Sequence, residues 1–215
     1  MFKTSKAGYN HPLFFMIEIK NLSFARGNNL IFHNVSFQVR PSELMVLKGT
    51  NGQGKTTLLS NIVNFLEPLE GEILYNGKSI DSHTASHCFL YIGENNFAYD
   101  NLSLNENIKY WLAIHNVNFS QEIRDKSIKF LFNELNLNLK FYQLSYGQKK
   151  KLQLLLLMLV NKPVWILDDP FNGLDKNTIE KITTLLSKKV ENNGLIIISS
   201  HQDVSIPNHK IFQLK

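Results

Sequence analysis

The residues from Gly49 to Thr56 read GTNGQGKT, a spacing that suits the binding of a phosphate chain. Gly52 and Gly54 allow the backbone to curl so that its N–H groups point inward at phosphate oxygens. Lys55 adds a full positive charge for the terminal phosphates, and the Thr56 hydroxyl can ligate Mg²⁺. The stretch therefore predicts a site for a nucleoside triphosphate with its magnesium ion.

Two adjacent carboxylates, Asp168 and Asp169, stand at the end of the apolar run VWIL. Two acids at the mouth of a buried strand are costly unless something positive lies beside them. In proteins with this kind of phosphate-binding loop, an Asp at the end of a nearby apolar strand holds the Mg²⁺, directly or through water. We therefore expect Asp168 to be a metal ligand, together with Thr56.

These side chains need strands and helices to position them. A continuous apolar run before Gly49 predicts a buried parallel strand, and helical spacing over 56–66 predicts a helix behind the loop. Alternating residues near the N-terminus predict an antiparallel region, and an Asn-Gly pair predicts a turn in the strand segment 71–80. Further strands are expected at 87–93, 163–167, 194–201 and 210–214, and helices at 103–116, 120–135, 145–159 and 177–190.

This order of elements predicts an α/β protein: a P-loop NTPase core with a mixed sheet, an N-terminal antiparallel β region and an inserted helical subdomain. We expect one domain over residues 16–215, with the helical subdomain at about 100–160 and residues 1–15 as an extension. The Lys149–Lys151 run is predicted to form a solvated helix face.

Composition narrows the class further. The chain has 215 residues, a net charge of +5 and 43% hydrophobic residues, as in an ordinary folded domain. Its single cysteine, Cys88, excludes an internal disulfide. The longest apolar run, 154–160, is far shorter than the ~20 residues of a membrane helix, so we expect any work at a membrane to need another chain.

Three segments after the phosphate-binding loop carry a family resemblance: LSYGQ (144–148), LDDPFNGLD (167–175) and SSHQD (199–203). In this order they resemble the ATP-binding subunit of an ABC transporter, and the resemblance covers nearly the whole chain. It implies a Walker A loop whose nucleotide-binding residues are Gly49, Thr50, Asn51, Gly52, Gln53, Gly54, Lys55, Thr56 and Thr57.

The resemblance also implies a head-to-tail homodimer with ATP between the loop of one chain and Ser145 and Gly147 of the other. The local chemistry agrees, because the hydroxyl and N–H groups at a helix N-terminus form an anion site. Asp169 stands where the family usually has Glu as the general base, and His201 matches a histidine that contacts the γ-phosphate.

Two further positions depart from the family pattern. Glu94 replaces a usual Gln, and its carboxylate could reach Mg²⁺ or a water on it. Arg26 falls near the position of an adenine-stacking aromatic and could stack on the base through its guanidinium plane.

Within the family, the segments 91–111, 144–154, 163–171 and 199–207 resemble the ATP-binding subunit of the haem exporter of cytochrome c maturation. This likeness implies Mg-ATP hydrolysis that drives integral-membrane permease subunits, with no nucleic-acid partner. The expected location is peripheral, on the inner (cytoplasmic or mitochondrial matrix) face of a membrane. Two alternatives stay open: the ATPase of another small ABC transporter, and an ATP-dependent switch with no role in transport.

Overall fold

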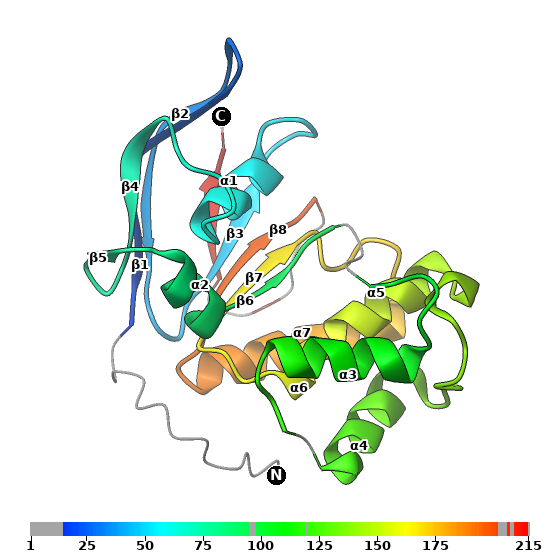
Figure 1. Ribbon diagram of the computed structural model, residues 1–215. Coiled ribbons are helices and arrows are strands. Elements are labelled where there is room, and N and C mark those ends of the chain that lie inside the picture. Colours follow the sequence, from blue (N-terminus) through cyan, green and yellow to red (C-terminus); the bar gives the residue numbers. More distant parts are fainter. Residues whose placement is uncertain (1–14, 95–97, 119, 202–205, 207–208, 215) are drawn as a thin grey trace.

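The computed structural model describes residues 15–94, 98–118, 120–201, 206 and 209–214, whose strands form two sheets (Figure 1). The first is antiparallel with the order β2-β1-β4-β5. Its strands are β1 (Ile17–Arg26), β2 (Asn29–Val39), β4 (Glu70–Tyr75) and β5 (Lys78–Ser79). The second is parallel with the order β6-β7-β8-β3-β9. Its strands are β3 (Leu44–Lys48), β6 (Phe89–Ile92), β7 (Val164–Asp168), β8 (Leu195–Ser199) and β9 (His209–Gln213).

Helices alternate with the strands of the parallel sheet along the chain, so the protein is of the α/β class, as predicted. The helices are α1 (Lys55–Ile62), α2 (Ser82–Cys88), α3 (Leu104–Ile114), α4 (Gln121–Phe132), α5 (Tyr146–Leu154), α6 (Leu156–Leu159) and α7 (Lys176–Glu191), with a 3₁₀ turn at Phe141–Gln143. The helices α3 to α6 come between β6 and β7 along the chain. Their treatment as a subdomain of 100–160 within one domain of 16–215 stays a prediction. In the described part of the chain, no helix has the length and apolar character needed to cross a bilayer.

Local sequence signals explain several element ends. Asn76 and Gly77 both have positive φ, 56° and 75°, which is the geometry of a tight hairpin between β4 and β5. Ser103 and Glu106 form the predicted capping box at the start of α3: Glu106 accepts from the Ser103 N–H at 2.7 Å, and the Ser103 hydroxyl accepts in return.

The expected strand at 87–93 is wrong at its first two residues, because His87 and Cys88 end helix α2. Asp81 caps this helix by accepting a hydrogen bond from the Thr84 N–H at 2.7 Å. Two turns of helix are too short to show a hydrophobic period, so the cap was the sole local signal.

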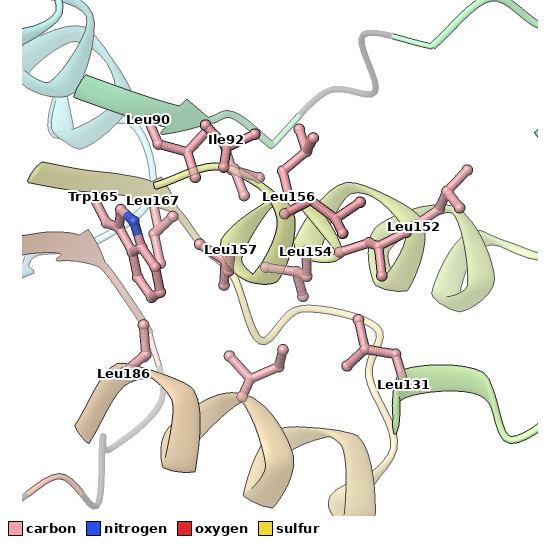
Figure 2. Packing of buried hydrophobic residues seen from close by; sticks show 14 of the residues in the cluster. Leu90, Ile92, Leu131, Leu152, Leu154, Leu156, Leu157, Trp165, Leu167 and Leu186 are labelled. Carbon is pink, nitrogen blue, oxygen red and sulfur yellow. The ribbon is translucent and has the colours of Figure 1, made fainter. Parts of the chain in front are cut away.

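Side chains alternate across the parallel sheet and form two cores. On the face toward α1 and the antiparallel sheet, Met45, Ile166 and Ile197 are buried with residues of β1, β2 and α1. On the other face, strand residues such as Trp165 and Leu167 pack against α5, α6 and α7, as Figure 2 shows. A strand covered on both faces must be apolar throughout, which explains the continuous apolar runs in the sequence.

All five parallel strands end at one edge, and this edge collects the predicted chemistry. β3 leads into the phosphate-binding loop, β6 into Glu94, β7 into Asp169 and β8 into His201. The strand order places β7 between β6 and β8, and places β3 beyond β8. Ligands of open α/β sheets bind outside the carboxyl ends of strands, so this edge is the candidate site.

Candidate nucleotide site

The phosphate-binding loop (Gly49–Thr56) follows β3 and runs into the first turn of α1, as predicted. Gly52 and Gly54 have φ of 83° and 92°, in the left-handed region that favours glycine. At Gly54 space is also short, because an added Cβ would lie 2.5 Å from the Cγ2 atom of Ile31 in β2. The loop therefore requires a glycine there for backbone conformation and for packing on the antiparallel sheet.

Lys55 is the first residue of α1, and its side chain is 8% exposed. Its ammonium donates to the carbonyls of Gly49 and Thr50 at 2.8 and 3.0 Å, so it lies within the curl of the loop. The Gln53 side chain also folds into the loop and accepts from the Thr50 N–H at 2.5 Å. Thr56, in the first turn of α1, is exposed. These positions suit an ammonium that faces phosphates and a hydroxyl that faces their metal ion.

Asp168 and Asp169 are joined by a residue that sequence reasoning missed, Ser199 at the end of β8. Its hydroxyl donates to Oδ1 of Asp168 at 2.5 Å and accepts from the Asp169 N–H at 2.9 Å. Ser199 lies directly opposite Asp168 in the parallel register of β7 and β8. A serine at a strand end, two residues before His201, was the available signal, but its partner depends on strand order.

The two acids differ in environment. Asp168 is 2% exposed, and within the described residues its buried Oδ2 atom has no hydrogen-bond partner. A buried carboxylate oxygen without a partner is costly, and carboxylate oxygen is a ligand that Mg²⁺ prefers. The residues thus fit a magnesium ion. Asp169 is partly exposed and has φ of 44°, a left-handed conformation that Asp tolerates better than most residues.

Glu94 and His201 are exposed at the ends of β6 and β8, on either side of the two acids. Arg26 is exposed at the end of β1, where it pairs with Asn29 across the β1–β2 hairpin. The same hairpin reaches the phosphate-binding loop through the contact of Ile31 with Gly54. The roles of Glu94, His201 and Arg26 toward metal, phosphate and base stay predictions.

The segment Leu144–Gln148 (the signature segment) begins helix α5 with a capping box. The exposed Ser145 is the N-cap: its hydroxyl accepts from the Gln148 N–H at 3.3 Å, and its N–H donates to Gln148 at 2.9 Å. A Cβ at Gly147 would lie 2.8 Å from the Gly173 carbonyl, so only glycine fits. The Tyr146 ring also lies against Gly173. The signature segment is therefore packed on the turn that follows Asp169.

Helix α5 makes a second link to this turn. Lys151 forms an ion pair with Asp175 at 2.6 Å, and Asp175 caps α7 by accepting from the Thr178 N–H at 2.9 Å. The hydrogen bond from Lys151, together with the cap, holds the pKa of the Asp175 carboxyl below its ordinary value. The predicted solvated face at Lys149–Lys151 is wrong, since Lys150 is 1% exposed and the side chains of Lys149 and Lys151 are 22% and 20% exposed.

We expect Asp175→Asn to destabilise the chain at pH 7 by no more than about 1 kcal/mol, because solvent screens this half-exposed pair. A lowered carboxyl pKa contributes stability above the ordinary Asp value of about 4, and this contribution is lost as pH falls through the folded pKa. The difference between variant and wild type should therefore shrink below about pH 4. Thermal unfolding at several pH values measures it, and a difference that does not depend on pH would contradict the ion pair.

The fold and the phosphate-binding loop define an ATPase of the P-loop class. The chain belongs to the ABC transporter family, whose family model matches residues 32–172. It is an ATP-binding subunit of a transporter of this family, with ATP hydrolysis coupled to transport.

Within this family, the chain is similar to the same kind of subunit that the sequence resemblance indicated. The chain is 35% identical over 188 residues to the cytochrome c biogenesis ATP-binding export protein CcmA of Wolbachia pipientis wMel, covering 86% of this chain and 89% of that protein. It is 35% identical over 193 residues to the CcmA of Reclinomonas americana, covering 88% and 86%. A solved ATP-binding subunit of an ABC transporter aligns with a TM-score of 0.76 and 26% identity, covering 86% and 79%.

Proposed function

We propose that this chain binds Mg-ATP as a head-to-tail homodimer and drives an integral-membrane permease that exports haem for cytochrome c biogenesis. The observation that supports the dimer is that two segments expected to contact phosphate are both exposed and belong to different parts of the chain. The phosphate-binding loop exposes Thr50, Asn51 and Thr56, and the signature segment exposes Ser145 on a separate helix. The similarity to CcmA over most of the chain supports the export role.

In this proposal the loop N–H groups and Lys55 bind the phosphates of ATP. Thr56 and Asp168 would hold Mg²⁺, with Glu94 near it, and the ion supplies positive charge that neutralises the phosphate oxygens. Asp169 orients and deprotonates the attacking water, and His201 contacts the γ-phosphate. Ser199 keeps the two acids at a fixed spacing, since its hydroxyl bonds to the side chain of one and the N–H of the other.

Ser145→Arg is expected to block ATP hydrolysis while leaving ATP binding by the single chain nearly intact. The arginine would place bulk and charge at the dimer interface, where the serine hydroxyl meets the partner's phosphates. Hydrolysis is followed by phosphate release, binding by calorimetry, and dimerisation by light scattering with ATP.

A matched control for this variant is Ser120→Arg at the start of α4. Ser120 is also an exposed N-cap whose hydroxyl accepts from the N–H three residues on, Ile123. The control therefore loses a comparable cap without touching the signature segment. Normal hydrolysis by Ser145→Arg would refute the shared site.

The export role is tested by expressing the tagged chain with its native membrane proteins and identifying what co-purifies. An integral-membrane permease whose haem content changes with ATP supports the proposal. A permease that carries no haem points to another small transporter, and a soluble partner points to a switch outside transport.

A further inference from the structure

Helix α5 carries a lysine whose ammonium is buried at the ends of two neighbouring strands of the parallel sheet, β6 and β7. Lys150 is 1% exposed, the most buried lysine that the described residues contain. Burial of an ammonium is costly unless hydrogen bonds and opposite charges compensate. Neighbouring groups must therefore compensate for the burial of the Lys150 ammonium.

The Lys150 ammonium donates to the carbonyls of Gly93 and Asp168, at 3.4 and 3.3 Å. These carbonyls lie just beyond the end of β6 and at the end of β7, two neighbouring parallel strands. Each carbonyl immediately precedes a residue of the candidate site, since Glu94 follows Gly93 and Asp169 follows Asp168. One ammonium thus ties together the two chain segments that present these carboxylates.

The electrostatic surroundings are consistent with a charged ammonium. Burial lowers the pKa of Lys150, and the carboxylates of Asp169, Asp168 and Glu94 oppose that shift. Lys55 bonds instead to its own loop at the end of β3. The two lysines therefore hold different parts of the site: Lys55 bonds to the phosphate-binding loop, and Lys150 bonds to the backbone that carries the acids.

Helix α5 connects this contact to the signature segment. Ser145 caps the helix at its exposed end, and Lys150 lies five residues further on, with its head group at the strand ends. Five residues of α-helix span about 7.5 Å, so a movement of the signature segment shifts the lysine with it. The lysine is therefore placed to transmit such a movement to the carboxylates.

We propose that Lys150 is a positioning residue for ATP hydrolysis: its ammonium joins the ends of β6 and β7 and sets Glu94 and Asp169 relative to the helix that begins with the signature segment. The inference rests on the proposed roles of these acids, but not on the proposed dimer or on haem as the transported substrate. In this proposal, helix α5 supports Glu94 and Asp169 of its own chain.

The test compares Lys150→Met, which keeps the unbranched shape of the side chain up to its fourth atom but removes the charge and donors, with Lys150→Arg, which keeps charge and donors. We expect kcat of the Met variant to fall roughly 100-fold, the cost of a displacement of about 1 Å, with KM changed less than about twofold. The Arg variant should recover a substantial part of the loss. Calorimetry should show an ATP dissociation constant near the wild-type value, since Lys55 and its loop are untouched.

Lys149→Met is the matched control. Lys149 is the preceding residue of the same helix, and its ammonium lies 4.9 Å from the centre of the Phe141 ring and 3.9 Å from Asp100, away from the strand ends. This variant should hydrolyse ATP at nearly the wild-type rate. If Lys150→Met is not recovered folded, Lys150→Gln replaces it, because Gln keeps a donor without the charge.

Three outcomes would overturn the inference. Wild-type kcat in Lys150→Met would show that the ammonium does not position the acids. If kcat, ATP affinity and unfolding temperature all fall together in Lys150→Met, the lysine only supports the fold. An Arg variant no better than Met would show that charge and donors are unimportant. Failure of the dimer model would appear separately, as normal hydrolysis in Ser145→Arg.

Discussion

Lys55→Ala is expected to weaken ATP binding at least about 100-fold, which corresponds to about 2.8 kcal/mol. The ammonium of Lys55 lies inside the curl of the phosphate-binding loop, where it donates to the Gly49 and Thr50 carbonyls. Alanine removes the full positive charge that faces the phosphates and leaves those two carbonyls without this donor. Isothermal calorimetry with ATP and Mg²⁺ measures the change.

The loop could also loosen when this side chain is lost, so a second variant separates charge from packing. Lys55→Met keeps the unbranched apolar stem, and so most of the apolar contacts, of a residue that is 8% exposed. Both variants should lose affinity, while the unfolding temperature without nucleotide stays closer to wild type in Lys55→Met. Unchanged affinity in either protein would contradict the assignment of the loop.

Asp169→Asn is expected to reduce hydrolysis by about 100-fold to 10,000-fold, the usual contribution of a general base. ATP binding should remain, and the ATP-bound dimer should accumulate because only activation of the water is lost. Asparagine also tolerates the left-handed backbone of this position, at φ 44°, so the loop should keep its shape. Phosphate release measures the rate, and size-exclusion chromatography with ATP measures the dimer.

Asp168→Asn should affect ATP binding rather than activation of the water, because the two acids have different expected roles. Asp168 has a buried oxygen suited to the metal, and its other oxygen accepts from Ser199. The amide removes charge from the metal site, so Mg²⁺-dependent ATP binding should weaken. Equal losses of binding in the two Asn variants would defeat the separation of their roles.

Asp169→Glu tests whether the shorter acid limits the reaction. The added methylene moves the carboxylate toward the place where the family usually has it. Where chemistry limits turnover, we expect the rate to rise up to about tenfold, or about 1.4 kcal/mol of barrier. The left-handed backbone costs Glu more than Asp, and this cost should appear as lower stability. A sharp fall in rate would show that the site has repacked around Asp.

The sequence by itself determined the features that depend on short segments. The glycines and Lys55 of the phosphate-binding loop follow from the conformations that only glycine adopts easily and from the charge of phosphate. The capping box at Ser103 and the Asn76–Gly77 hairpin follow from local hydrogen bonds and turn geometry. The apolar runs predicted strands buried on both faces. Each signal acts within a few residues, which is why sequence alone was sufficient.

The tertiary structure decided which distant segments meet. Ser199 bridges Asp168 and Asp169 because β8 lies beside β7, and strand order is not encoded in any single segment. Lys150 belongs to a run that looked like a solvated face, yet α5 turns it toward the ends of β6 and β7. A charge repeated three times has no period that marks the buried member. Only the packing of the helix against the sheet selects it.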